Sequence, residues 1–162
     1  MNLYPPSKRL CVRAAITLLV SLFVIFIASQ LTATHAAATT FTVNSLADTP
    51  DGFPGNGTCA TATGVCTLRA AIEEANSLSG DDTINFSVTG TINLSGALPV
   101  LSSNVTINGP GPSLLTVRRE TGGNYRIFQT NNTTSISGLT ITNGRTPDGV
   151  NEDIAPFGGG IW

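Results

Sequence analysis

The chain has 162 residues, of which 41% are hydrophobic and 11% charged, and its formal net charge is −2. That length suits one modest domain around a single core. Eight basic residues stand against ten acids, so the composition offers no basic patch and excludes a nucleic-acid partner.

The first 38 residues follow the pattern of a secretory signal peptide. A basic start that contains Lys8 precedes an uncharged apolar run, residues 14–28. This run is shorter than the ~20 residues that a membrane-spanning helix needs, so an uncleaved anchor is the less favoured alternative. We predict cleavage after Ala38 or Ala36, contact with the membrane only during export, and a secreted or cell-surface protein.

Cleavage would change the chemistry that the chain offers. The single His, three of the eight basic residues and Cys11 would be removed, which leaves a net charge of −5. Serine or cysteine hydrolysis with a His base is then excluded. Cys59 and Cys66 remain, and in an oxidising compartment we expect them to form a disulfide. A metal site would need more thiols or a His.

The stretch that follows the cysteines predicts a short amphipathic helix that ends at Gly80. Thr67 is the expected N-cap residue. Residues at i, i+3, i+4 and i+7 form its apolar face. They are Leu68, Ala71, Ile72 and Ala75.

Residues 41–44 alternate apolar and polar side chains and predict a short strand. Residues 48–57, with the sequence DTPDGFPGNG, are rich in turn formers. Asp48 and Asp51 in this stretch offer oxygens to calcium, but we favour side-chain-to-backbone turns.

From residue 82 the sequence consists of short, similar, alternating segments, such as TINF and TINL. Their spacing alone also allows a sandwich or a barrel. Their mutual likeness favours an all-β fold, a right-handed parallel β-helix (solenoid), with Asn, Thr and Ser stacked in ladders and the helix covering one open end. The expected inward side chains are Ile84, Phe86, Ile92, Leu94, Val105, Ile107, Leu115, Val117, Ile127, Leu139 and Ile141.

The predicted organisation has three parts. They are a signal peptide (1–38), an N-terminal cap with the disulfide and the helix (39–80), and β-helix coils (81–162). The sequence ends in FGGGIW, in what looks like the start of another strand, so we expect the chain to be truncated at its C-terminus.

The segment from Phe41 to Phe86, with CTLRAAIEEAN at its centre, resembles the bacterial CSLREA N-terminal domain. Thr67 and Ala70 replace the Ser and Glu of the family name, and Ala71 matches its final Ala. The later segments, among them SISGLTITNG, resemble the right-handed parallel β-helix (pectin-lyase-like) repeats that follow this domain. The resemblance implies export, a bacterial cell-surface or extracellular setting, and no assigned activity.

Candidate catalytic residues are few. Asp148, Glu152 and Asp153 form the densest acidic cluster, near Arg145, and would be a metal or ligand loop if calcium, the one cofactor that the sequence allows, binds there. A solvated loop is the favoured interpretation. Asp81 and Asp82 follow Gly80, and we expect them to form a turn. Arg69 and Glu73, four residues apart, predict a surface ion pair.

These observations predict an exported, structural or adhesin-like β-helix module without catalysis in this chain. Its partner would be a polysaccharide or a host or cell-surface ligand. The alternative is a carbohydrate-active enzyme, similar to pectate lyases or polygalacturonases, that acts on acidic polysaccharide; such a glycosidase would need two carboxylates that converge on the sugar.

Overall fold

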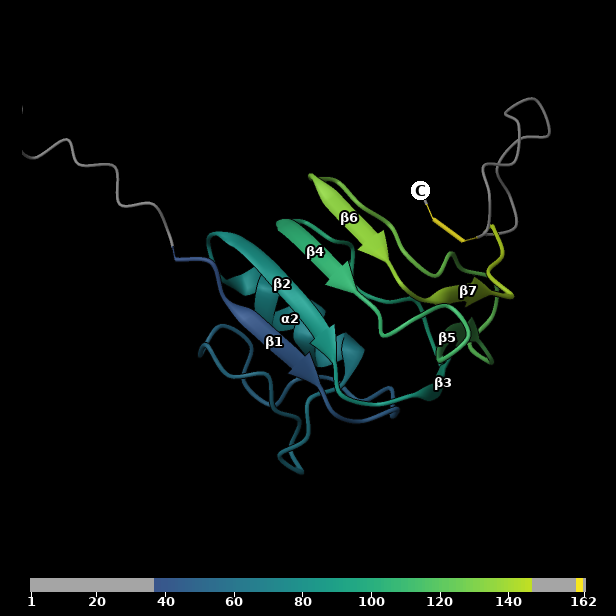
Figure 1. Cartoon of the computed structure of the whole chain (residues 1–162), viewed down its shortest axis with the longest axis horizontal. Helices are drawn as coiled ribbons and strands as arrows, with labels where there is room; N and C mark the ends of the chain where they lie inside the picture. The colour runs from purple at the N-terminus through teal and green to yellow at the C-terminus, as the bar shows by residue number, and fades with distance from the viewer. Residues whose placement is uncertain (1–36, 147–159, 162) are drawn as a thin grey trace, which may run out of the picture. The chain divides into compact units, whose positions relative to one another are not determined.

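The protein is described by a computed structural model that covers residues 37–146 and 160–161. The elements are short and lie in the order β1, α2, then β2 to β7 (Figure 1). Their bounds are β1 Thr40–Val43, α2 Leu68–Ser77, β2 Asp81–Phe86, β3 Gly90–Leu94, β4 Asn104–Asn108, β5 Leu115–Arg119, β6 Thr134–Ser137 and β7 Thr140–Thr142.

The strands form two separate parallel sheets. One has four strands in the order β1-β2-β4-β6, and the other has three in the order β3-β5-β7. From β2 onward the chain therefore alternates between the two sheets. The register keeps like residues opposite each other, as when Thr83 pairs with Thr106 and Ile84 with Ile107.

The predicted right-handed parallel β-helix is wrong, because the two sheets are not curled into a solenoid. Alternation and local likeness predict which short segments pair, but closure of a coil depends on the connections between them. Those connections, residues 95–103 and 120–133, are irregular and pair with each other only through a single parallel bridge between Leu101 and Thr130. The fold is also not all-β in its core, since α2 contributes to it.

Two glycines let the chain turn away from the four-stranded sheet at equivalent places. Gly109 follows β4 and Gly138, with a φ of 66°, follows β6. A Cβ atom on Gly109 would lie 2.1 Å from the carbonyl oxygen of Gly138. Only residues without a side chain allow the two turns to stack this closely, and Gly138 also has the left-handed conformation that glycine favours.

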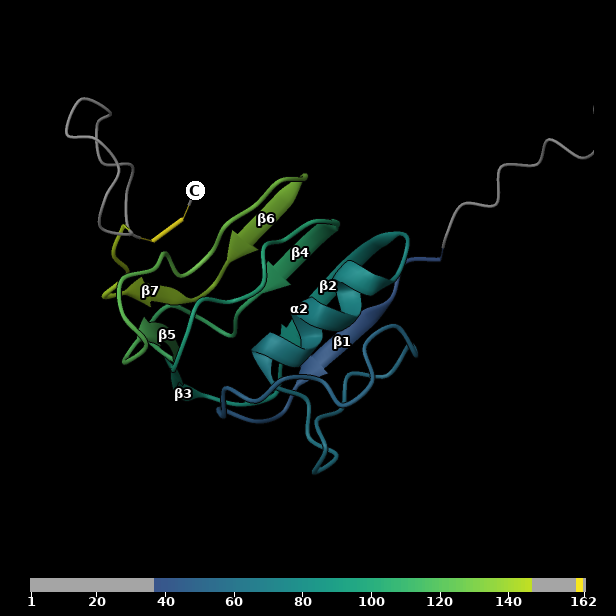
Figure 2. The same cartoon turned by 180° about the vertical axis from the view of Figure 1, so that it is seen from behind.

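The helix packs against β1 and β2, behind them in Figure 1 and in front of them in Figure 2. Thr67 is its N-cap, as predicted, and its hydroxyl accepts a hydrogen bond from the backbone N–H of Ala70 at 3.1 Å. The predicted apolar face is buried throughout, with Leu68 1% exposed and Ala71, Ile72 and Ala75 fully buried. The helix ends before Gly80, with Leu78 as its C-cap.

The core joins this helix face to the inward side chains of both sheets. Among the predicted inward residues, Phe86, Leu139 and Ile141 are only partly buried and the other eight are buried. Sequence patterns missed Leu98, Leu101 and Phe128, because these buried residues lie in irregular connections where no period marks them.

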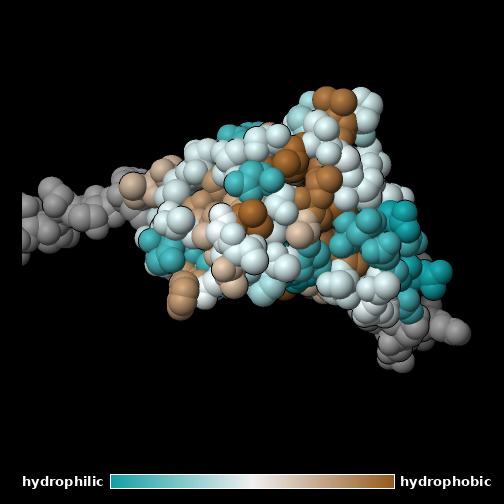
Figure 3. All heavy atoms as spheres, turned by 90° about the horizontal axis from the view of Figure 1, so that it is seen from below, coloured by the Kyte–Doolittle hydropathy of each residue, from teal (hydrophilic) through white to brown (hydrophobic). Residues whose placement is uncertain are grey.

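Few large hydrophobic side chains in the described residues are exposed, namely Phe53, Leu114 and Ile161. In the view from below, brown hydrophobic residues come to the surface mainly in the middle of the face, among paler and teal ones (Figure 3). No helix among the described residues is long and apolar enough to cross a membrane.

Candidate functional site

The predicted disulfide is confirmed. The Sγ atoms of Cys59 and Cys66 are bonded, and their Cα atoms are 5.1 Å apart. Cys66 is buried next to the first turn of α2, so the bond ties the preceding loop to the helix start. The predicted metal or ligand loop, with Asp148, Glu152 and Asp153, lies outside the described residues.

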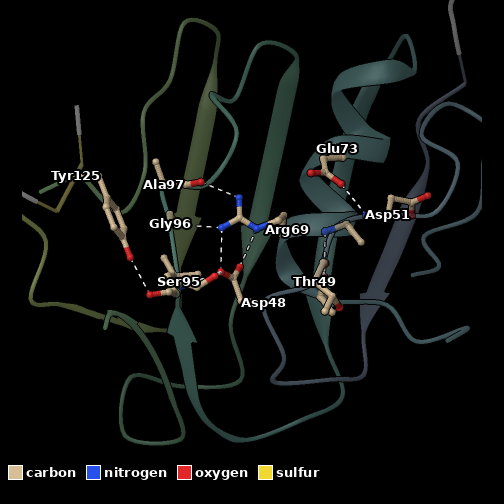
Figure 4. A network of polar contacts seen from close by, with 12 residues as sticks. Asp48, Thr49, Asp51, Arg69, Glu73, Ser95, Gly96, Ala97 and Tyr125 are labelled. Carbon is tan, nitrogen blue, oxygen red and sulfur yellow. Dashed lines mark hydrogen bonds and ion pairs between the residues drawn. The ribbon is translucent and has the colours of Figure 1, made fainter. Parts of the chain in front are cut away.

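Arg69 does not form the predicted pair with Glu73. Its guanidinium instead binds both carboxylate oxygens of Asp48, at 2.9 and 3.0 Å (Figure 4). It also donates to the carbonyls of Gly96 and Ala97, and Asp48 accepts from the N–H and the hydroxyl of Ser95. Both charges are thus satisfied within the protein, and neither is available as a catalytic group.

The other acids of this region are also engaged by backbone N–H groups. Asp51 accepts from Phe53 and Ala60, each at 2.8 Å, which confirms its predicted turn-forming role. Glu73 accepts from the N–H of Asp51 at 2.7 Å (Figure 4). The fully buried Glu74 accepts from the N–H groups of Gly55 and Gly57. These carboxylates order the loop before α2.

Tyr125 has a largely buried phenol whose acidity is changed by its surroundings. Its hydroxyl donates to the carbonyl of Leu94 at 2.7 Å (Figure 4). Burial raises the pKa of Tyr125 above its usual 10.0, and the nearby Arg119 charge opposes this rise. A phenol with a raised pKa stays protonated at neutral pH, so Tyr125 acts as a structural donor.

The solvent-facing side of the four-stranded sheet carries a regular array of uncharged polar side chains. Because side chains alternate between the two faces of a strand, these residues point away from α2. We call this surface the outer face; it comprises Thr40, Thr42, Thr83, Asn85, Asn104, Thr106, Asn108, Thr133, Ser135 and Ser137.

The outer face contains the predicted ladders of like side chains. The register places Thr40, Thr83, Thr106 and Ser135 in one row across the sheet. In the next row, Asn108 donates to the Asn85 side chain and accepts from Ser137, both at 3.4 Å. The result is a repeating surface of hydroxyls and amides.

A pocket of about 200 Å³ lies at the amino ends of β2, β4 and β6. It is lined by Asp81, Asp82, Asn104, Val105, Thr106, Thr133, Thr134 and Ser135. The two aspartates do not form the predicted turn, because they begin β2. Asp81 is exposed and accepts from the Asn104 amide at 2.8 Å. Asp82 is only 1% exposed.

Periodicity could have placed Asp82 in the interior. It is two residues before Ile84 on the same strand, so both side chains point to the inward face. The adjacent Gly80 directed the interpretation toward a turn instead. Within the described ranges, no group of three or more His, Cys, Asp or Glu residues is arranged to hold a metal ion.

No protein-family model, curated protein or solved structure matches this chain. The resemblance to the CSLREA domain therefore stays a prediction from the sequence motif.

Proposed function

We propose that this protein is an exported, non-catalytic surface module that binds a polysaccharide through the outer face of its four-stranded sheet. The observation that carries this proposal is the regular array of hydroxyl and amide groups in rows across four parallel strands. Hydroxyls and amides both donate and accept hydrogen bonds, as the hydroxyls of a sugar do.

The geometry of a parallel sheet suits a repeating ligand. Neighbouring strands are about 4.8 Å apart and side chains on one face repeat about every 6.6 Å along a strand. Each hydrogen bond to a sugar would add only about 1 kcal/mol net, so binding should depend on many contacts with a polymer rather than on one sugar. This favours retention on polysaccharides over tight binding of monosaccharides.

Two further features support export and a binding role. The Cys59–Cys66 disulfide is typical of a protein that works in an oxidising, extracellular setting. Asp48, Asp51, Glu73 and Glu74 are occupied by internal hydrogen bonds, so they are poor candidates for the paired acids of a glycosidase.

The test is retention on insoluble cellulose, chitin and cell-wall polysaccharide and in gels that contain polygalacturonate. The double variant Thr83→Val, Thr106→Val removes two hydroxyls from the outer face while keeping side-chain shape. Its matched control is Thr116→Val in β5 of the other sheet. We expect the double variant to lose most of the retention and the control to keep it.

Two results would reject the proposal. One is equal retention by the double variant and wild type, which would move any binding to another surface. The other is release of new chain ends or unsaturated products from polygalacturonate, which would make the protein a carbohydrate-active enzyme.

A further inference from the structure

Asp82 is a buried acid at the start of β2 that lacks a balancing charge. Its side chain is only 1% exposed. Its Oδ1 accepts a hydrogen bond from the backbone nitrogen of Thr39 at 2.8 Å, and its Oδ2 is buried without a hydrogen-bond partner. None of the five described arginines bonds to Asp82, and the described chain has no lysine. A buried carboxylate is stable only when a positive charge or several hydrogen-bond donors balance it.

The nitrogen that contacts Asp82 lies at the predicted cleavage site. The sequence allows cleavage after Ala38 or after Ala36, and each would produce a different first residue. Ala38 is exposed and precedes β1, whereas Thr39 is partly buried and its carbonyl accepts from the N–H of Thr83 at 2.8 Å. The backbone contacts between β1 and β2 therefore reach back to Thr39.

Cleavage after Ala38 would turn this nitrogen from an amide into a charged group. A signal peptidase of the exporting cell would use water to hydrolyse the bond between the carbonyl carbon of Ala38 and the nitrogen of Thr39. The removed segment keeps the carboxylate, and the nitrogen of Thr39 takes up a proton and becomes an ammonium group at neutral pH. An amide N–H donates one hydrogen bond without a net charge, whereas an ammonium group has three donor protons and a full positive charge.

We propose that the exported chain begins at Thr39 and that its α-ammonium group forms a buried ion pair with Asp82. The pair balances the charge that both carboxylate oxygens share. Cleavage after Ala36 would leave an uncharged amide at Thr39, so the structure favours the bond after Ala38. The pair also fixes the start of β1, an edge strand of the four-stranded sheet (Figure 1). This inference rests on the export that the proposed function assumes, but not on polysaccharide binding.

The first test identifies the first residue of the exported protein. The full chain is expressed in an exporting bacterial host, and the exported product is analysed by intact mass spectrometry and N-terminal sequencing. We expect a chain that begins at Thr39. Ala38→Leu removes the small residue before this bond and should move cleavage to the bond after Ala36. That variant provides an exported chain that begins at Ala37 as the matched comparison.

The second test measures how fast the first amine reacts. The only lysine of the sequence is Lys8, in the removed segment, so the exported chain has a single primary amine, at its first residue. A paired, buried ammonium group reacts only after the pair opens, so an N-hydroxysuccinimide ester should acylate the folded chain that begins at Thr39 about tenfold more slowly than the one that begins at Ala37. In denaturant the two chains should react at the same rate.

Thermal melts of the same two chains measure what the pair contributes. We expect the chain that begins at Thr39 to melt roughly 5–10 °C above the one that begins at Ala37. In the Asp82→Asn background, this difference and the slow acylation should both disappear. Asp81→Asn makes the same charge change on the opposite, exposed face of β2 and is the control, which should behave like wild type. If Asp82→Asn does not fold, the comparison of the two chains that keep Asp82 still tests the pair.

Two results would overturn the ion pair. One is an exported product that begins at a residue other than Thr39, an uncleaved chain included. The other is a chain that begins at Thr39 but is acylated as fast, and melts at the same temperature, as the chain that begins at Ala37. Neither result changes the expected retention on polysaccharide, and loss of retention would not move the cleavage site. Failure of this inference and failure of the proposed function can therefore be told apart.

Discussion

The region before β2 and the strands after it are held together in different ways. Residues 44–80 contain one helix, one disulfide and a long loop, and the loop is fixed by charged side chains. Asp48, Asp51 and Glu74 each bind two or more groups that lie at least two and up to 47 residues away.

The strands use few such contacts. Residues 81–142 are held by parallel backbone ladders and by apolar side chains stacked in register, such as Ile84 on Ile107. Their polar side chains mostly face solvent, and hydrogen bonds among those side chains measure 2.8 Å between Asn104 and Asp81 and 3.4 Å on the Asn85 row. Tyr125 is different, because it is buried and its hydroxyl donates a hydrogen bond to the carbonyl of Leu94.

The two regions satisfy the hydrogen-bonding groups of their backbone in different ways. An irregular loop cannot satisfy its backbone N–H groups with a neighbouring strand, so buried carboxylates must satisfy them. A parallel strand satisfies its own backbone, which leaves its outward side chains free for a ligand. Substitutions should therefore cost more in the first region than in the second.

The largest difference is expected for isoleucines in the two regions. Ile72→Ala on the fully buried face of α2 should lower the free energy of unfolding by about 2–5 kcal/mol, because it removes buried methyl groups and leaves a cavity. Ile136→Ala in β6, where the side chain is only partly buried, should cost clearly less. Urea unfolding of both variants would measure this, and equal losses would contradict the comparison.

The next largest effect is expected for the disulfide. The double variant Cys59→Ser, Cys66→Ser should lose roughly 2–3 kcal/mol, since the bond restricts the unfolded chain. We expect the loop and helix to open before the strands. Hydrogen exchange measured residue by residue should show that α2 loses protection before the strands do. A thermal melt of the double variant identical to that of wild type would refute the prediction.

A smaller effect is expected at the ion pair. Asp48→Asn weakens the hydrogen bonds to Arg69 and to Ser95, and should cost about 2 kcal/mol, as for hydrogen bonds that involve charged groups. The same change at the exposed Asp81 should lower the free energy of unfolding by no more than about 0.5 kcal/mol. Chemical denaturation would measure the free energy of unfolding of both variants. Equal losses would contradict the expected difference between the buried Asp48 and the exposed Asp81.

An effect smaller than that of Asp48→Asn is expected at Tyr125, where Tyr125→Phe should lower the free energy of unfolding at neutral pH by about 1 kcal/mol through the lost hydrogen bond. Its folded-state pKa lies above the unfolded value, so its contribution is complete below pH 10 and is lost as pH rises through the folded pKa. Wild type should therefore lose stability more steeply than Tyr125→Phe as pH rises above 10. Urea unfolding at several pH values in that range measures how steeply the free energy of unfolding falls with pH. Equal slopes for wild type and Tyr125→Phe would contradict the raised pKa of Tyr125.

Local sequence determined the elements whose signal is periodic. The spacing of Leu68, Ala71, Ile72 and Ala75 predicted the helix face, and Thr67 predicted its start. Two cysteines in a short segment predicted the disulfide. Alternation in segments such as TIN predicted most inward residues and the ladders on the outer face. The helix face, its N-cap, the disulfide and the alternation within a strand each depend on residues that are close in the sequence. A short segment is therefore enough to predict them.

The tertiary structure decided what distant segments do together. The partner of Arg69 is Asp48, 21 residues away, because the folded loop brings that carboxylate closer than the helix neighbour Glu73. The division of the strands into two sheets, rather than a coil, depends on irregular connections that no pattern describes. The buried, half-satisfied Asp82 appears only when β1 is laid beside β2, since its one partner is the N–H of Thr39.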